Sequence, residues 1–196
     1  MTDTAATRPP GPGDRARAWW RRVCDPASGD PGARAQLRRC RSTNDVLAIP
    51  AGMNLPRMLG VLPRDGAYVD ARFARALDLA RVLAHVTEDG GGSPMREVGW
   101  PTFPGSRREG EMDRGPRLSE ARFRRLMQSE GGEDLVAQFT RLIALMGGRA
   151  NVAALSDAFR WWDHPDGRTK QRWAFEYFNA GAAARSTNIS SEESAE

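Results

Sequence analysis

Arginine is the side chain whose spacing in this sequence best fits a chemical task, and that task is holding phosphate. Residues 8–41 contain nine arginines against three aspartates. Arg34, Arg38 and Arg41 follow at steps of four and three, so one helix would present them together, with Arg39 one position further round. A guanidinium stays charged and can donate two parallel hydrogen bonds to phosphate oxygens. This pattern therefore predicts a surface that binds an anionic backbone.

Two further basic groups occur in the second half of the sequence. One interleaves with apolar residues of a predicted helix and continues on the next helix. The other crowds the start of the last predicted helix, where positive charge opposes the helix dipole and an anionic partner would explain it. A solvated face with ion pairs along the same helix is the ordinary alternative. The two groups are Arg122, Arg124, Arg125 and Arg141, and then Arg168, Lys170 and Arg172.

Catalytic and metal-binding patterns are not found in the sequence. His85 and His164 have no serine or cysteine partner that the spacing identifies, and Gly90–Gly92 lacks the Lys-Ser/Thr of a phosphate loop. Cys24 and Cys40 are the only cysteines, too few with two histidines for a standard zinc site, and we expect them to be free core residues. The sequence predicts no enzyme, no cofactor and no metal.

The elements that must position the arginines are predicted to be helices. Apolar residues recur at three- and four-residue steps, and no stretch alternates long enough for a strand ladder. The prediction is an all-α fold of two small helical bundles with about eight or nine helices. They cover residues 14–24, 31–41, 43–48, 55–62, 69–86, 119–128, 133–146, 151–162 and 169–182.

The chain of 196 residues divides by composition into five segments. We expect a disordered leader at 1–13, an N-terminal helical domain at 14–86 and a long loop or linker at 87–116. A C-terminal helical bundle at 117–182 and a disordered acidic tail at 183–196 follow. No apolar run is long enough to span a bilayer, and residues 1–14 lack the layout of a secretory signal, so we expect a cytoplasmic protein without membrane contact.

Several motifs resemble the CasB family, the small subunit of the type I-E CRISPR Cascade. Ala18-Trp19-Trp20 and Arg34-Ala35-Gln36-Leu37-Arg38-Arg39-Cys40 are similar to its beginning. Asp157-Ala158-Phe159-Arg160-Trp161-Trp162 and Arg172-Trp173-Ala174-Phe175-Glu176-Tyr177-Phe178 are similar to its end. The resemblance covers residues 14–180 in order, apart from the segment 87–116.

The resemblance implies an all-helical subunit of an RNA-guided antiviral complex, present in two copies beside other Cascade subunits. It implies contacts with guide RNA and target DNA, including the displaced strand, through basic residues. By position, Arg39, Arg122 and Arg141 would be nucleic-acid contacts. The full set of candidates is Arg34, Arg38, Arg39, Arg41, Arg122, Arg141, Arg168, Lys170 and Arg172.

Two other functions remain open from the residues. One is a generic helical DNA-binding regulator, which would need base-reading side chains on a recognition helix. The other is a purely structural subunit whose arginines reflect the coding bias of a GC-rich genome. Because 28 of the 29 basic residues are arginine, composition alone does not separate that bias from selection for phosphate contacts.

The predicted helix faces can be tested through the core. Phe73, Leu77 and Leu83 should be buried together, as should the second-half residues Phe123, Phe139, Leu142, Phe159 and Trp162. We expect Leu77→Ala to lower the free energy of unfolding by about 2–5 kcal/mol, through lost burial and the cavity left behind. Urea unfolding measures the loss, and an unchanged midpoint would show that the helix face is misassigned.

Overall fold

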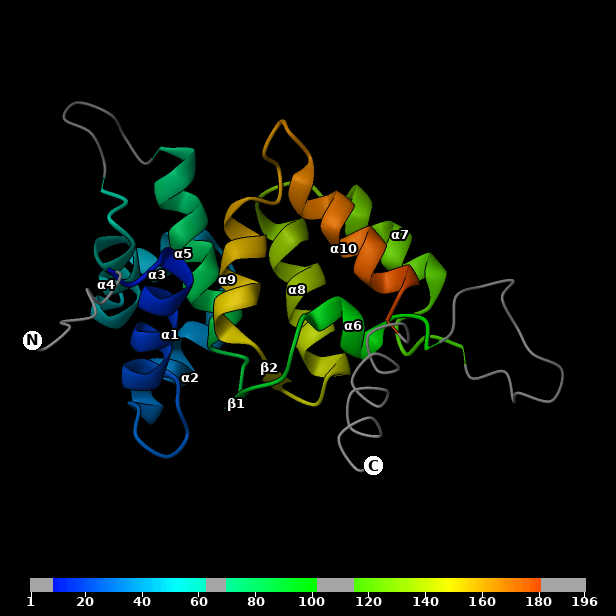
Figure 1. Ribbon diagram of the computed structural model, residues 1–196. Coiled ribbons are helices and arrows are strands. Elements are labelled where there is room, and N and C mark those ends of the chain that lie inside the picture. Colours follow the sequence, from blue (N-terminus) through cyan, green and yellow to red (C-terminus); the bar gives the residue numbers. More distant parts are fainter. Residues whose placement is uncertain (1–8, 63–69, 102–114, 181–196) are drawn as a thin grey trace, which may run out of the picture.

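The computed structural model is almost entirely helical, as predicted, and it describes residues 9–62, 70–101 and 115–180. Most of the predicted leader and all of the predicted tail at 183–196 lie outside these ranges. The described residues form ten helices and one pair of very short strands (Figure 1). The helices are α1 Pro12–Val23, α2 Pro31–Arg39, α3 Thr43–Leu47, α4 Pro50–Leu59, α5 Ala71–Leu83, α6 Pro94–Val98, α7 Glu120–Gln128, α8 Glu133–Leu145, α9 Val152–Arg160 and α10 Arg168–Phe178.

The helix predicted at 55–62 differs from α4, which begins five residues earlier. Pro50 occupies the first helical turn, where a missing N–H costs nothing. Gly52 lies inside the helix at a close contact. A side chain there would not fit, because its Cβ would come 2.5 Å from Val46 Cγ1. Pro56 is also inside the helix and is buried. Residues that usually interrupt a helix are thus used here for its start and for close packing.

The segment 87–116, predicted as a long loop, contains regular structure. Strand β1 (Glu88–Asp89) pairs in parallel with β2 (Arg149–Ala150), and α6 follows soon after. The Trp100 backbone N–H then donates to the Tyr177 carbonyl at 2.7 Å. Two-residue strands and a five-residue helix are too short for sequence periodicity to reveal. Residues 102–114 of this segment lie outside the described residues.

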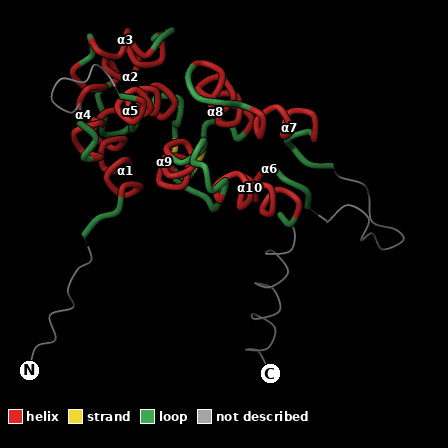
Figure 2. The backbone as a smooth tube through the Cα atoms, turned by 90° about the horizontal axis from the view of Figure 1, so that it is seen from above, coloured by secondary structure: helices red, strands yellow, loops and turns green. Residues whose placement is uncertain are grey.

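Helix α1 joins the N-terminal helices to α9 of the second half of the chain. It packs most extensively against α9 and also contacts α4, while α5 contacts both α8 and α9. Gly13 allows the approach, because a Cβ there would lie 3.0 Å from Ala153 Cβ. Seen from above, α2, α3, α8 and α7 follow one another along one side, opposite α1, α9 and α10 (Figure 2).

The buried apolar residues form one continuous core. All eight predicted core residues belong to it, and the most exposed of them, Phe123, is only 7% exposed. The Phe139 ring lies 5.0 to 5.3 Å from the rings of Phe159, Trp162 and Trp173. Helices of both predicted bundles contribute to this core. The division into two domains at 87–116 stays a prediction.

Cys24 and Cys40 are both free, as predicted. Cys24 is fully buried, and burial raises the pKa of its thiol to about 12, so it stays protonated. Cys40 is partly buried and packs against the core.

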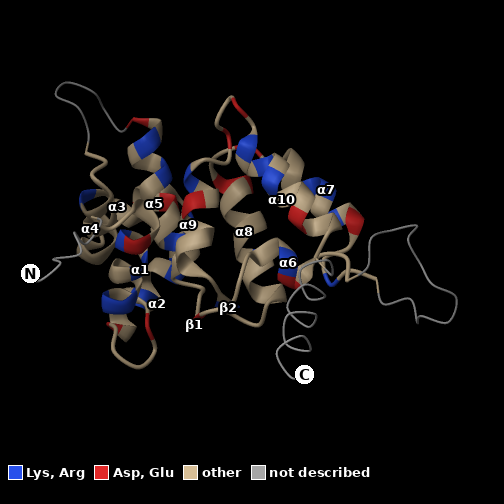
Figure 3. Ribbon diagram, in the orientation of Figure 1, with Lys and Arg blue, Asp and Glu red and all other residues tan. Residues whose placement is uncertain are grey.

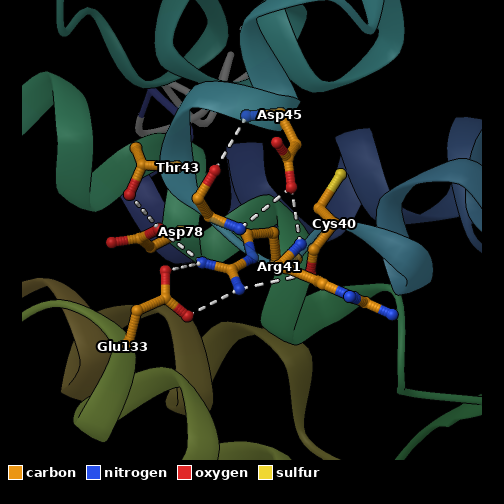
Figure 4. Close-up of polar contacts among 8 residues, drawn as sticks. Cys40, Arg41, Thr43, Asp45, Asp78 and Glu133 are labelled. Carbon is orange, nitrogen blue, oxygen red and sulfur yellow. Dashed lines mark hydrogen bonds and ion pairs between the residues drawn. The ribbon is translucent and has the colours of Figure 1, made fainter.

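A buried arginine joins three parts of the fold. Arg81 on α5 is 5% exposed, and its two terminal nitrogens donate to the two Glu133 carboxylate oxygens at 2.6 and 2.8 Å. The same guanidinium donates to Asp78 Oδ1 at 3.2 Å and to the Cys40 carbonyl at 3.2 Å. Thr43 Oγ1 completes the cluster by donating to Asp78 at 2.8 Å (Figure 4). The end of α2 and the start of α8 are therefore tied to one side chain in the last turn of α5.

We expect Arg81→Ala to be strongly destabilising, because it leaves the buried Asp78 carboxylate without its cationic partner. Breaking a buried pair in this way costs about 3–5 kcal/mol. Urea unfolding measures the loss, with Arg38→Ala as a control that removes the same charge from an exposed position and should stay within about 0.5 kcal/mol. Equal midpoints for the two variants would contradict a structural role for Arg81.

Candidate nucleic-acid interface

The arginines predicted to share one face of α2 are divided between exposed positions and one partly buried position. Arg38 and Arg39 are exposed on the last turn of the helix. Arg41 lies beyond the helix end, and its exposed side chain points away from the acids drawn in Figure 4. Within the described ranges, none of these three side chains forms a hydrogen bond or an ion pair. Three guanidinium groups at the end of α2 are thus available to a ligand.

Arg34 is turned toward the protein instead. Its Nε donates to the Ala84 carbonyl at 3.1 Å, and its Nη2 lies 3.5 Å from the Val86 carbonyl. These carbonyls follow the end of α5, where the helix leaves backbone oxygens without partners. Arg34 therefore donates hydrogen bonds to the free carbonyls at the end of α5. Although it lies four residues before Arg38, its side chain is not on the same surface.

The second basic group lines a groove between α7 and α8. Arg122 and Arg125 from α7 and Arg141 from α8 border a space of about 410 Å³, whose apolar lining includes Leu126 and Leu142. All three arginines are exposed, and in the described part of the chain none is paired with an acid. Arg122 and Arg141, which the sequence placed on separate helices, are brought to one groove.

Arg125 belongs to this groove but is absent from the predicted binding residues. Its spacing from Arg122 is three residues, which puts both on the same face of α7. That signal is present in the sequence, and only the position of Arg141 opposite them required the fold. Arg124, also exposed, does not line the groove.

The basic residues at the start of α10 have different surroundings. Lys170 donates to the Ser129 carbonyl at 3.2 Å and lies 5.4 Å from the centre of the Trp162 ring, so it joins α10 to the turn before α8. Arg168 is 85% exposed and pairs with Asp166 at 3.4 Å. Arg172 is exposed and unpaired among the described residues. Blue segments of the ribbon mark the start of α10 in Figure 3.

The remaining titratable groups offer no alternative chemistry in the described ranges. His85 is half-buried, and burial together with the charges of Arg38, Arg34 and Arg81 lowers its pKa, so it is neutral at pH 7. No group of three histidine, cysteine, aspartate or glutamate side chains there could hold a metal ion. None of the described helices has the length and apolar character needed to cross a membrane.

The described residues thus define a mostly helical, arginine-rich protein in which two groups of exposed, unpaired arginines lie at the end of α2 and in the α7–α8 groove. The family model of the CRISPR-associated protein Cse2 matches residues 33–178, and the chain belongs to this family. The match begins after α1 and spans the segment 87–116. Searches of curated proteins and of solved structures gave no significant match.

Family membership fixes the general role of the chain. It is the small subunit of a type I-E Cascade surveillance complex, and it is a non-catalytic, structural subunit of that complex. The family resemblance drawn from the sequence motifs is therefore confirmed over residues 33–178. The roles of the individual arginines are not decided by it.

The different surroundings of Arg34 and Arg39 predict different effects of the same substitution. Arg34→Met keeps the apolar stem but removes hydrogen bonds from a charged donor, each worth about 1.5–3 kcal/mol. Thermal unfolding should therefore show a clear loss for Arg34→Met, and almost none for the matched control Arg39→Met. If Arg34→Met melts like the wild type and yet binds nucleic acid more weakly, Arg34 is a ligand contact and not a brace.

Proposed function

We propose that this subunit holds the phosphate backbone of nucleic acid in Cascade without reading sequence. Its ligands are the guide RNA paired with target DNA and the displaced DNA strand. The observation that carries the proposal is the α7–α8 groove, where Arg122, Arg125 and Arg141 from two helices converge without an acidic partner among the described residues. In RNA-guided complexes base pairing selects the target, so the protein needs only backbone contacts.

Mutual repulsion makes such a groove costly without a ligand. Three exposed like charges around one apolar floor raise the free energy of the empty groove, and an anionic ligand removes that cost. Arginine also suits phosphate better than lysine does, because its planar guanidinium can donate two hydrogen bonds to phosphate oxygens, whereas lysine is a point charge. The exposed Arg38, Arg39 and Arg41 extend the same chemistry, because α2 lies on the same side of the molecule as α8 and α7 (Figure 2).

The proposal gives the candidate residues unequal parts. Arg39, Arg122 and Arg141 contact phosphate, and Arg38, Arg41 and Arg125 support them. Arg168 and Arg172 form a weaker basic surface at the start of α10, while Arg34 and Lys170 act as braces. Family membership supports contacts with other Cascade subunits, and we include a second copy of this chain among the proposed neighbours.

The groove is tested by the triple variant Arg122→Ala, Arg125→Ala and Arg141→Ala. Affinity for two duplexes of unrelated sequence should fall by a similar factor, since phosphates are alike everywhere. The slope of log affinity against log salt should flatten by about 2 to 3, at roughly 0.7–0.9 for each phosphate that the variant no longer neutralises. A salt series with both duplexes measures these quantities, and melting temperature checks folding.

The matched control removes the same charge elsewhere, through alanine at the exposed Arg21, Arg22 and Arg57. It should lose far less affinity than the groove variant. Equal losses would mean that net charge alone drives binding. Unchanged affinity and slope in a folded groove variant would refute the phosphate role.

In the assembled complex the groove variant should load guide RNA normally but hold an opened target less well.

A further inference from the structure

A second basic cavity lies apart from the α7–α8 groove and has an aromatic ring in its wall. It measures about 450 Å³, within the range of small-ligand sites, and lies between the ends of α4, α5 and α9. Arg72 and Arg75 line it from α5, and Arg160 and Trp161 line it from the end of α9. In Figure 3 the ribbon of α5 is blue at this end, where basic residues lie.

Trp161 is unusual in its exposure. Almost half of its surface, 48%, is open to solvent, whereas the adjacent Trp162 is 1% exposed and fills the core. The Trp161 ring meets the His164 ring edge to face at 5.2 Å, and the Arg160 guanidinium lies 5.8 Å from its centre. A large ring held between these groups and open to solvent is suited to stacking against a flat ligand.

The arginines of the cavity have donors to spare. Arg160 Nη1 is buried and has no hydrogen-bond partner among the described residues. Such an orphaned donor costs free energy, and a turn of the Arg160 guanidinium toward the cavity that it lines would let a ligand oxygen satisfy it. Asp163, which lines the cavity, is already paired with Arg75, and Asp166 pairs with His164 at 3.0 Å. Asp157 interacts with the charge of Arg160 from the same helix, without an ion pair between them. The exposed Arg72 has no acidic partner among the described residues, so the cavity keeps a positive charge that faces solvent.

We propose that this cavity takes one unpaired nucleotide of a single-stranded nucleic acid. The base stacks on Trp161, and the adjoining phosphate accepts hydrogen bonds from Arg160 and Arg72. The proposal rests on the function proposed above and adds to it a site that distinguishes single strands from duplexes. In a duplex the faces of the bases are covered by their neighbours, so only an unpaired base can use the ring.

The test compares three ligands: a short oligothymidine, an abasic strand of the same length and a duplex. Trp161→Ala should weaken oligothymidine binding about 5- to 150-fold, the range for removing one base–aromatic stack. Its binding to the abasic strand and the duplex should be unchanged. Trp161→Phe should keep most of the affinity, and Phe175→Ala, which removes another exposed aromatic ring on α10, should have no effect.

Intrinsic fluorescence gives a second readout. The chain has six tryptophans, and oligothymidine should quench the emission of the wild type more than that of Trp161→Phe. Arg160→Gln should weaken binding of both the oligothymidine and the abasic strand, because it removes a phosphate contact.

Equal losses on oligothymidine and abasic strand for Trp161→Ala, or no loss at all, would overturn the stacking site. The groove proposal fails separately, if the wild type does not bind the duplex or the abasic strand. If the wild type binds oligothymidine through Trp161 but does not bind the duplex, the cavity stands and the groove is rejected.

Discussion

The bidentate pair between Arg81 and Glu133 is the interaction on which the arrangement of the basic surfaces depends. It connects α5 to the first turn of α8, and the same guanidinium holds the Cys40 carbonyl at the end of α2. The free arginines of α2 are therefore positioned relative to α8, which carries one wall of the groove. A change at this pair would alter both the fold and the relative placement of two basic surfaces.

Burial separates two uses of the same side chain. Arg34 donates to a backbone carbonyl and Arg81 to carboxylates of the protein itself. Arg17 pairs with Asp89 at 2.8 Å beside the short strands. Arg38, Arg39 and Arg141 present their charge to solvent. An arginine-rich composition produced by coding bias would explain neither group by itself. The arginines with protein partners hold parts of the fold together, while the exposed ones that converge in one groove are the basis of the proposed phosphate contacts.

Sequence periodicity predicted the long helices and their buried faces because the apolar residues of α5, α8 and α9 repeat at the helical spacing. It could not predict the start of α4, because prolines and a glycine usually interrupt a helix. Only the structure shows that Gly52 is needed for the close contact with Val46. It grouped Arg34 with Arg38 because spacing along a helix does not say where that helix meets another. The groove required knowledge of how α7 and α8 pack. In the sequence Trp161 is only one member of a motif, and exposure is what distinguishes it from Trp162.

The packing of α1 against α9 has a consequence for synthesis on the ribosome. Trp19 and Trp20 leave the exit tunnel long before α9 exists, yet the fold buries both almost completely. At translation rates of about 5–20 residues per second, the apolar side of α1 waits on the order of 10 s for its main partner. The hydrogen bond from the Trp19 indole N–H to the Ala51 carbonyl can form earlier and gives part of that surface temporary cover. Sequences that slow translation between α1 and α9 would lengthen this exposure and favour aggregation of the nascent chain.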